Sequence, residues 1–453
     1  MKKIVLSILF IGSLVAQNSV VRQFSKAFAD VAEKAKPAVV TIITDKVISM
    51  RQFDDFGFFF QPNGPRQREF KTNALGSGVI VDSKKGYILT NNHVVDEMDG
   101  IRVKLIDKRE FEATIIGTDP KTDLAILQID ADKLEDIQMG DSEELRVGEW
   151  VMAVGSPFSE NLSHTVTTGI VSAIGRSNIL DSGSYEDFIQ TDAAINPGNS
   201  GGALVSVNGN LVGVNTAIYS KSGGSHGIGF AVPSNMVRAV IRGVSPGGGL
   251  VWPWFGATGQ SVSQDIANSL GLERPTGVLI TAVHKAGAAA KVGIAVGDVV
   301  LAVNGHEVND TIGLRHRIAT LPIGDSAVVR LWRGGKTRAV RLALMAAPDK
   351  PRKNETKMDG SQPLSGAIVG NMSPALAERT GVDPFVTGVF IFNIIRGSPA
   401  NRLGFRAGDY LRLVNNRPVP SVKDLIREME KPADRWRIAV LRNGRTRELI
   451  INR

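Results

Sequence analysis

Short apolar runs separated by turn residues dominate residues 76–230. They are rich in β-branched residues, and a further run of the same kind precedes them at 38–44. The runs lie at 78–81, 87–90, 101–107, 113–117, 124–129, 151–155, 169–174 and 211–218. Many short strands at regular spacing predict a β-barrel or a β-sandwich. Apolar residues at helical spacing predict a helix before this region, over 20–36, and one after it, over 233–243.

An internal repeat follows the β-rich region. Residues 276–308 align without gaps on 387–419. The shared positions include Gly293 with Gly404, Asp298 with Asp409, and Asn304 with Asn415. Upstream of each copy a short helix is predicted, with serine at its N-cap and glycine just past its end. The pattern predicts two copies of one small α/β module. We interpret the Gly- or Pro-bearing stretches at 245–249 and 347–362 as linkers, the second of them flexible.

The first residues have the pattern of an export signal. Residues 1–16 hold two lysines, then an apolar run, then a small residue. This predicts a secretory signal peptide cleaved after Ala16, with a retained amphipathic anchor as the alternative. No later segment reaches the roughly 20 apolar residues that a transmembrane helix needs. We therefore expect the mature protein outside the cytoplasm.

A phenylalanine-rich insertion lies within residues 45–73. Six phenylalanines fall among proline, glycine and polar residues over 52–70, which argues against a buried strand. Two interpretations stay open. The rings form a surface for a partner or substrate, or they collapse locally on a disordered loop.

Composition excludes several classes of function. The net charge is +8, but lysine and arginine are scattered and no basic stripe with interleaved aromatics indicates nucleic acid. Contact with an anionic membrane surface stays open. The chain has no cysteine, which excludes disulfides, cysteine catalysis and thiolate zinc sites. No cluster of ligand residues points to a metal or a cofactor.

The candidate chemistry centres on Ser200. Glycines surround it at Gly198, Gly201 and Gly202. A nucleophilic serine needs open space and nearby N–H groups for a developing oxyanion, and glycines supply both. A plain glycine-rich turn between strands is the alternative, so the hypothesis depends on a base and a group that orients it.

His93 and Asp123 are the candidates for those two roles. His93 follows two asparagines at the end of a predicted strand, where it is held and still faces a cleft. Asp123 directly precedes an apolar run, so it can be buried enough to orient an imidazole. A structural histidine and a turn-forming aspartate are the plainer interpretations. Of the other histidines, His316 lies between two arginines on a predicted helix, and we expect it to be solvated.

Three motifs in order carry a family resemblance. They are TNNHVV at 90–95, TDLAIL at 122–127 and GNSGGAL at 198–204. With a signal sequence before them and two repeats after them, the chain resembles the HtrA family of DegP-like, Do-type periplasmic serine proteases, and the repeats resemble PDZ domains. The implied fold is mainly β: a chymotrypsin-like double β-barrel over 17–244, PDZ domains over 250–346 and 363–453, and a linker over 347–362.

The resemblance also implies roles for particular residues. Ser200 is the nucleophile, His93 the general base and Asp123 its orienting partner, with the N–H groups of Gly198 and Ser200 as the oxyanion hole. Ile218 and Ile228 are expected near the primary specificity pocket, although the plain core-strand interpretation stays open for Ile218. Arg176 is the candidate relay residue of a regulatory loop over 176–188, and the 45–73 insertion matches a loop that shields the site.

For the modules, the resemblance implies binding of C-terminal peptides. Phe255, Gly256 and Ala257 match the loop that captures a terminal carboxylate with backbone N–H groups. In the second module Ser365 stands where the family has an apolar residue, which puts peptide capture there in doubt.

The resulting hypothesis is an ATP-independent serine endopeptidase of the periplasm, or secreted, that degrades unfolded exported proteins under stress. The family adds chaperone activity and self-association into trimers or their multiples. The alternatives are a PDZ scaffold or holdase, and a site-specific regulatory protease triggered by C-terminal peptides.

Overall fold

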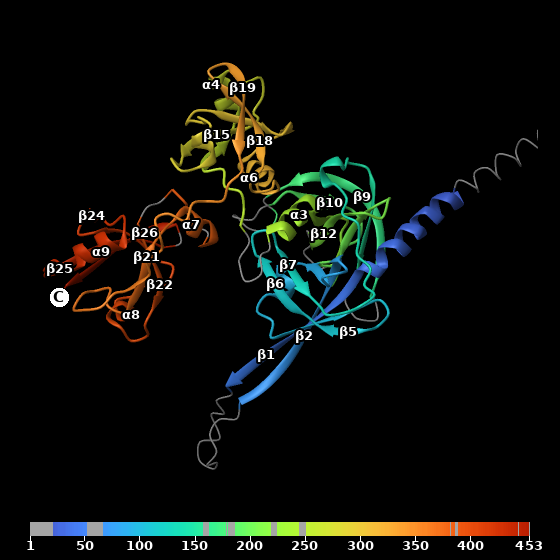
Figure 1. The fold of residues 1–453 in the computed structure, drawn as a ribbon, viewed down its shortest axis with the longest axis horizontal. Coiled ribbons are helices and arrows are strands. Elements are labelled where there is room, and N and C mark those ends of the chain that lie inside the picture. The colour runs from blue at the N-terminus through green and yellow to red at the C-terminus, as the bar shows by residue number, and fades with distance from the viewer. Residues whose placement is uncertain are drawn as a thin grey trace, which may run out of the picture. The chain divides into compact units, whose positions relative to one another are not determined.

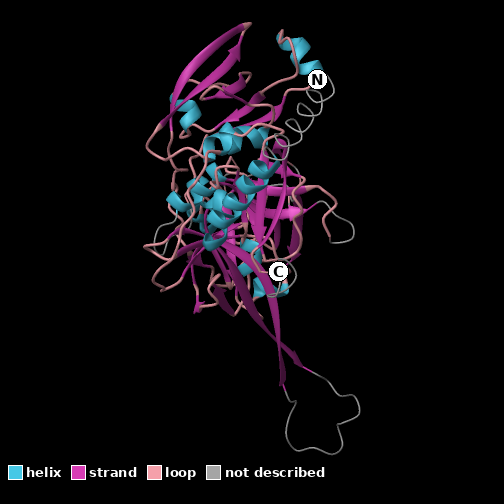
Figure 2. Ribbon diagram, turned by 90° about the vertical axis from the view of Figure 1, so that its right-hand side faces the viewer, coloured by secondary structure: helices cyan, strands magenta, loops and turns pink. Residues whose placement is uncertain are grey.

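The computed structural model describes residues 21–51, 67–156, 163–177, 179, 186–218, 224–243, 251–380, 382–385, 388–442 and 444–452. Strands are more abundant than helices among these residues (Figure 2). The predicted signal peptide, the centre of the phenylalanine-rich insertion, most of the 176–188 loop and the 245–249 linker lie outside the described residues. Among the described helices, none combines the length and the apolar character needed to cross a membrane.

Seven strands form the first sheet, in the order β5-β4-β1-β2-β3-β7-β6. The strands are β1 (Val39–Arg51), β2 (Gln67–Asp82), β3 (Tyr87–Thr90), β4 (Gly100–Lys104), β5 (Glu110–Glu112), β6 (Thr114–Asp119) and β7 (Leu124–Gln128). Their alternating apolar residues bury one face, where Ile42, Ile88 and Leu127 belong to one core cluster.

The ends of β1 and β2 reach into the predicted insertion. The two strands pair antiparallel from Val39↔Val79 as far as Arg51↔Gln67. The prediction of a loop over 45–73 is therefore wrong at both ends, where the backbone forms a long two-stranded ribbon (Figure 1). Periodicity failed here because apolar and polar residues do not alternate regularly over 45–51 and 67–73, although the strand pairing continues.

Six further strands close into a barrel, in the order β10-β13-β12-β11-β8-β9. They are β8 (Trp150–Gly155), β9 (Thr165–Arg176), β10 (Phe188–Thr191), β11 (Ala203–Ser206), β12 (Leu211–Ile218) and β13 (Gly229–Pro233). Val151, Ile189 and Leu204 lie in its core. Two 3-10 turns, η1 (Lys36–Ala38) and η2 (Ser142–Glu144), and the helices α2 (Asn92–Val95) and α3 (Ser234–Gly243) complete this part.

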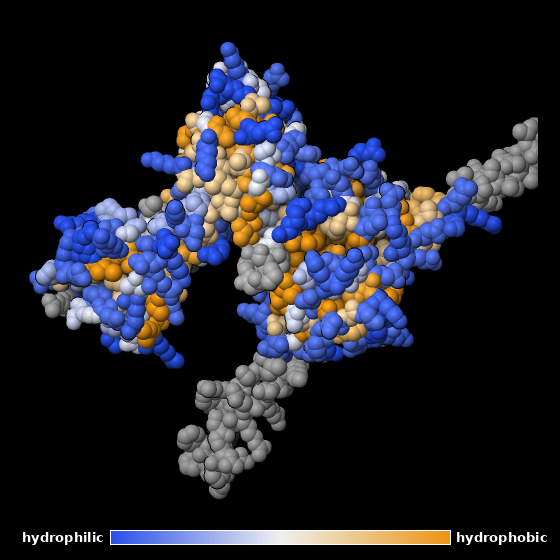
Figure 3. Space-filling view, in the orientation of Figure 1, coloured by the Kyte–Doolittle hydropathy of each residue, from blue (hydrophilic) through white to orange (hydrophobic). Residues whose placement is uncertain are grey.

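The predicted N-terminal helix is present over residues 21–35. Phe24 and Phe28 of this helix stack with Trp150 at ring-centroid distances of 5.8 and 5.5 Å. Val21 and Phe24 stay more than half exposed, and apolar surface is visible over this helix (Figure 3).

Each repeat folds as a small sheet with short helices, as predicted. The first has the strand order β14-β15-β16-β18-β19 with β17 on β16, and the second β20-β21-β22-β23-β25-β26 with β24 on β23. The first module contains β14 (Ala257–Ser261), α4 (Gln264–Leu270), β15 (Val278–Val283), α5 (Ala288–Lys291), β16 (Val299–Val303), β17 (His306–Glu307), α6 (Thr311–Ala319), β18 (Ser326–Arg333) and β19 (Lys336–Ala343). The second contains β20 (Thr356–Lys357), β21 (Ala367–Asn371), α7 (Pro374–Thr380), β22 (Val389–Ile394), α8 (Pro399–Arg402), β23 (Tyr410–Val414), β24 (Arg417–Pro418), α9 (Val422–Met429), β25 (Arg435–Arg442) and β26 (Arg445–Asn452).

The interpretation of 347–362 as a flexible linker needs correction. Thr356 and Lys357 form the strand β20 on the edge of the second module, and Met358 is buried in that module's core. Upstream, Asp349 accepts a hydrogen bond from the Ser373 hydroxyl at 2.7 Å. Polar, proline-bearing composition indicated a free linker, but the backbone of this segment is bound along its length.

Candidate active site

His93 and Asp123 lie side by side at one edge of the first sheet. His93 is on α2, which begins directly after β3, and Asp123 directly precedes β7, the neighbour of β3. The imidazole Nδ1 is 2.8 Å from Asp123 Oδ2 and 3.0 Å from Oδ1. The backbone N–H of His93 also donates to Oδ1, at 3.0 Å. The carboxylate thus contacts both the ring and the backbone of the histidine.

The backbone around Asp123 is fixed by two neighbours of His93. The Asn92 N–H donates to the Asp123 carbonyl at 3.0 Å, and the Asn91 side-chain amide donates to the same oxygen at 2.8 Å. Asp123 itself has φ 55, a left-handed conformation that aspartate tolerates better than most residues. The two asparagines therefore hold Asp123 in a strained conformation that directs its carboxylate to His93.

Thr216 of β12 connects the aspartate to the serine. Its hydroxyl donates to Asp123 Oδ2 at 2.6 Å, and its carbonyl accepts the Ser200 hydroxyl at 3.2 Å. The threonine is buried, so both bonds are shielded from water. Sequence reasoning missed Thr216, because nothing in a β-branched strand position distinguishes it from a core residue. Among the described residues, no hydrogen bond joins Ser200 directly to His93.

Close packing explains the glycines after Ser200. A Cβ on Gly201 would lie 2.1 Å from the Ser77 carbonyl oxygen, and one on Gly202 would lie 2.3 Å from the Val154 carbonyl oxygen. The predicted reason, open space for a substrate, is therefore wrong for these two positions. They let the serine loop pack against the strands beneath it.

The N–H groups of Gly198 and Ser200 are available to a ligand. Gly198 has φ 98, and its carbonyl accepts the Ser77 hydroxyl at 2.6 Å. The Ser200 carbonyl accepts the Ser77 N–H at 2.8 Å. Within the described residues, neither the Gly198 nor the Ser200 N–H has a hydrogen-bond acceptor. Two nearby N–H groups without an acceptor are what the predicted oxyanion hole requires.

The candidate specificity residues lie at one end of the second barrel. Ile218 ends β12 and is paired with Gly229, directly after Ile228. Both isoleucines are partly buried, and Ile218 packs against the core of the barrel. The structure thus brings the two together, and the core-strand interpretation of Ile218 is compatible with its packing.

Comparison with known proteins agrees with this geometry. The family model of the trypsin-like peptidase domain matches residues 76–214, and that of the PDZ domain matches 256–344 and 360–452. A probable periplasmic serine endoprotease DegP-like of Pseudomonas putida (strain W619) is 40% identical over 92% of this chain and 91% of its own. The periplasmic serine endoprotease DegP of Salmonella typhimurium is 41% identical over 80% of this chain and 73% of its own.

The chain belongs to the DegP/HtrA family of serine endoproteases. Among solved structures, the HtrA-type protease AlgW with decapeptide is 40% identical, has a TM-score of 0.54, and covers 71% of this chain and 99% of its own. The mainly β fold, with a trypsin-like protease domain and two PDZ domains, is confirmed.

The predicted capture loop of the first PDZ domain and the corresponding loop of the second have the same backbone bonds. The Gly256 carbonyl accepts the His284 N–H at 2.8 Å, and the Gly366 carbonyl accepts the Ile395 N–H at 2.9 Å. Both glycines have positive φ, 71 and 86. Phe255 is buried beside Gly256, whereas the corresponding Ser365 is half-buried. The loops therefore differ in side chain more than in backbone.

A buried ion pair repeats in both PDZ domains. Arg333 Nε donates to Asp298 Oδ1 at 2.5 Å, and Arg442 Nε donates to Asp409 Oδ1 at 2.5 Å. A second nitrogen of each arginine reaches the other carboxylate oxygen at 2.6 Å. Burial opposes ionisation of Asp298, but the Arg333 guanidinium outweighs it and lowers the pKa of that carboxyl. The aspartates shared between the repeats are thus structural anchors.

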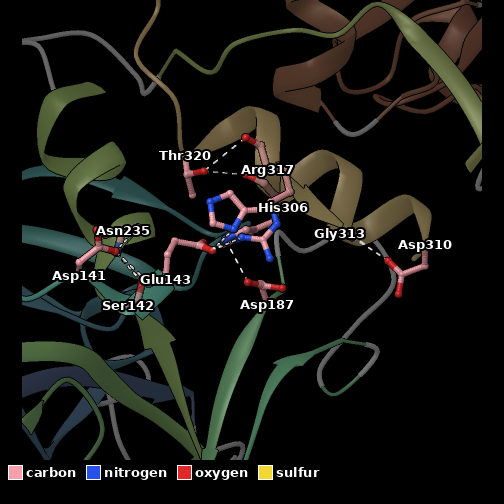
Figure 4. Close-up of polar contacts among 11 residues, drawn as sticks. Asp141, Ser142, Glu143, Asp187, Asn235, His306, Asp310, Gly313, Arg317 and Thr320 are labelled. Carbon is pink, nitrogen blue, oxygen red and sulfur yellow. Dashed lines mark hydrogen bonds and ion pairs between the residues drawn. The ribbon is translucent and has the colours of Figure 1, made fainter. Parts of the chain in front are cut away.

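Helix α6 of the first PDZ domain packs beside the two ends of the 176–188 segment, the predicted regulatory loop. His316 Nε2 is 3.1 Å from Asp187 Oδ2. Arg317 pairs with Glu143 (Figure 4). Glu143, Asp187 and Arg317 line a cavity of about 290 Å³ together with Gly175 and Glu186, near the two ends of the 176–188 segment. The prediction of a solvated His316 is wrong, because its helix is covered and the side chain is fully buried.

Electrostatics at this contact are unusual. Burial, followed by the charge of Arg317, lowers the pKa of His316 to about 3, with Glu143 opposing. Burial also raises the pKa of Asp187. Glu143, Asp187 and His316 lie close enough to hold a metal ion, which sequence reasoning did not foresee. However, the Arg317 guanidinium already binds Glu143, and a cation at that place disfavours a metal ion.

Arg176, the candidate relay residue, lies at the end of β9. Its Nε donates to the Gln190 side-chain oxygen at 2.9 Å, and its side chain is exposed. Its neighbour Gly175 lines the cavity beside α6.

Proposed function

We propose that Ser200, His93 and Asp123 are the catalytic triad of this serine endoprotease. The proposal rests on the contact of both Asp123 carboxylate oxygens with His93 Nδ1. Thr216 links this pair to Ser200 through one hydrogen bond to each of Asp123 and Ser200. A carboxylate on Nδ1 fixes the tautomer in which Nε2 is free to accept a proton.

Each residue then has a defined step. The Ser200 hydroxyl turns from the Thr216 carbonyl to His93 Nε2, gives up its proton there, and its oxygen attacks the scissile carbonyl carbon. The N–H groups of Gly198 and Ser200 donate to the resulting oxyanion. His93 passes the proton to the leaving amine, and water hydrolyses the acyl-enzyme by the same steps. Asp123 stabilises the imidazolium throughout.

A fluorophosphonate probe tests the triad. We expect the wild-type chain and the control Ser206→Ala to be labelled, and Ser200→Ala to remain unlabelled. Turnover of Ser200→Ala should fall by about 10⁶-fold. Thr216→Val keeps the shape but loses the bond to Asp123, and should lower kcat by about 10–100-fold, since hydrogen bonds to charged groups contribute about 1.5–3 kcal/mol. Labelling of Ser200→Ala would refute the assignment of the nucleophile.

We further propose that the substrates are unfolded or misfolded exported proteins. Support comes from the PDZ domains and from relatives named periplasmic endoproteases. Ile218 and Ile228 then favour small or medium aliphatic residues before the cut. Export by the 1–16 signal, chaperone activity and trimer-based assembly belong to the same proposal. The test is cleavage-site mapping on unfolded casein. A stably folded protein, used as the control substrate, should resist cleavage.

A regulatory protease triggered by C-terminal peptides is the second candidate. It is favoured by the packing of α6 beside the ends of the 176–188 loop, with Arg176 as relay, and by the peptide bound to the relative AlgW. Capture at Phe255, Gly256 and Ala257 would deliver the signal. Cleavage of casein that needs an added C-terminal peptide supports this candidate, and cleavage without the peptide supports the degradative one.

A further inference from the structure

The free edge of β21 in the second PDZ domain is covered by the chain itself. Strand β20 pairs with it antiparallel, with Thr356 opposite Val369 and Lys357 opposite Ile368. PDZ domains bind an extended peptide by adding it as a strand to a sheet edge. Residues 355–358, here called the strap, therefore lie as a bound peptide would lie on a PDZ sheet.

The end of the strap meets the capture loop. The Met358 N–H donates to the Ala367 carbonyl at 2.8 Å, and the Gly366 N–H donates to the Met358 carbonyl at 2.7 Å. Gly366 is the glycine that corresponds to Gly256 of the predicted capture loop, and its φ is 86. The Met358 carbonyl thus occupies the position at which a capture loop binds a terminal carboxylate.

The Met358 side chain fills an apolar pocket. It is 4% exposed and belongs to the cluster that holds Leu364 and Val369 beside β21, and Leu425 and Met429 on α9. Lys357, one residue earlier, points to solvent. A buried last side chain with an exposed one before it is the alternation expected of a peptide added to a sheet edge.

Residues before the strap are bound as well. Asn371 donates its backbone N–H to the Lys353 carbonyl at 2.6 Å and its side-chain amide to the Arg352 carbonyl at 2.9 Å. The Lys353 ammonium lies 4.0 Å from the centre of the Phe392 ring. Arg352 and Lys353, which precede the strap, are therefore also bound to the second PDZ domain.

The first PDZ domain is arranged differently. β14 is the last strand on its sheet path, and its residues are exposed or half-buried. The chain that enters this domain pairs elsewhere, because the Trp254 N–H donates to the Met345 carbonyl at 2.8 Å beyond β19. A strand across the capture edge is thus not a general requirement of this repeat.

We propose that the strap is a built-in ligand of the second PDZ domain. The domain accepts an external C-terminus only when the strap leaves, and the C-termini that fit end in an unbranched apolar residue such as methionine. This inference goes beyond the proposed proteolysis, and its tests use Ser200→Ala so that they do not depend on catalysis.

The first test locks the strap. Lys357 and Ile368 face each other across the ladder, where Cα atoms lie about 4.5–5.5 Å apart, within the range of a disulfide. The chain has no cysteine, so K357C with I368C introduces a single possible bridge. We expect it to form under mild oxidation, while K357C with the exposed K423C on α9 should not. Failure of the first pair to oxidise would overturn the placement of the strap.

The second test asks whether a peptide displaces the strap. The probe is the hexapeptide KNETKM, the chain's own residues 353–358, with a free carboxylate. At millimolar concentration it should slow oxidation of the K357C/I368C pair at least fivefold, whereas its C-terminal amide should not. Equal rates with both peptides would refute an exchangeable ligand. This measurement uses folded protein and needs no destabilising change.

The third test releases the strap from the sheet edge of the second PDZ domain. Every chain carries Gly256→Val to block the first PDZ domain, because a Cβ there would lie 2.4 Å from Gly287 Cα. Met358→Asp places a charge in the apolar pocket and should raise affinity for fluorescein-labelled KNETKM at least tenfold, while the exposed control Lys357→Asp should not. Hydrogen exchange of β25 that matches the parent chain would show that the domain is folded. A folded Met358→Asp chain without a gain in binding would contradict the proposal.

Discussion

The two PDZ domains have the same backbone bonds at their capture loops but differ in what lies on the neighbouring strand. In the first, β14 is exposed; in the second, β21 is covered by β20 and Met358. Their shared features are the glycine with positive φ and the Asp–Arg pair. The same fold thus leaves a sheet edge exposed in one copy. In the other copy, the preceding segment of the chain covers the corresponding edge.

The largest expected effect is on the shared ion pair. Asp409 and Arg442 are more buried than Asp298 and Arg333, whose arginine side chain is 37% exposed. Asp409→Ala leaves a buried guanidinium unpaired and should destabilise the second domain by about 3–5 kcal/mol. Asp298→Ala should cost less, because water reaches Arg333. Hydrogen exchange of β25 and β18 in urea measures both, and equal losses would contradict the burial argument.

The second-largest effect is expected for Met358, the strap side chain that is buried in the core of the second domain. Met358→Ala removes a buried side chain and should lower the free energy of unfolding of this domain by about 2–5 kcal/mol. Lys357→Ala, on the exposed face of the same strand, should stay within about 0.5 kcal/mol of wild type. Urea unfolding followed through hydrogen exchange of β21 compares the two. A Met358→Ala chain as stable as the lysine control would mean that the strap is not anchored.

The stability of α6 should depend on pH, whereas that of α9 should not. His316 is buried, and its pKa of about 3 lies below the unfolded value near 6.5. Its contribution to stability is therefore complete above pH 6.5 and is lost as pH falls from there towards 3. At pH 5 the loss should be about 2 kcal/mol.

The corresponding residue of the second domain is Arg427, which is exposed and pairs with Asp424 on its own helix. We expect hydrogen exchange of α6 to rise between pH 7 and pH 5, and that of α9 to stay constant after correction for intrinsic rates. His316→Phe should remove the change in α6 and leave only the opposite contribution of Asp187, whose raised pKa favours the folded state at low pH. Equal pH profiles for His316→Phe and wild type would exclude the histidine.

The smallest expected effect is on peptide capture by each loop. Gly256→Val should weaken binding of C-terminal peptides at least tenfold, about 1.4 kcal/mol, because the side chain collides with Gly287. Gly366→Val should leave binding unchanged, since the strap occupies that domain. Fluorescence anisotropy with a free-carboxylate peptide and its amide tests both. A loss in Gly366→Val would show that external peptides already reach the second domain.

Local sequence patterns predicted the repeats and the pairing of His93 with Asp123. Both depend on short motifs at strand ends, and neighbouring strands bring such ends together at one edge of a sheet. The spacing of the apolar runs predicted a β-rich fold but left a barrel and a sandwich open. The trypsin-like fold was expected only from the family resemblance of the three motifs. The roles of Ser200, Gly198, Ile218, Ile228 and Arg176 stay predictions.

Features that depend on distant contacts could not be predicted. Thr216 looks like any β-branched strand residue until β12 is placed beside the serine loop. His316 looks solvated between two arginines until α6 is covered. The strap looks like a linker because its single buried anchor, Met358, is surrounded by polar residues. In each case the deciding contact is a tertiary one, about which neither composition nor local periodicity carries information.

The seated strap also shortens the tether between the domains. The Pro348 carbonyl already accepts the Ala375 N–H, so little free chain remains between the two folds. A ligand joined to its own site acts at an effective concentration of about millimolar. A free peptide of micromolar intrinsic affinity must compete with that concentration, and its apparent affinity falls in proportion to the open fraction. On the proposal made above, only abundant or multivalent C-termini enter the second domain, so that it responds above a threshold concentration of peptide.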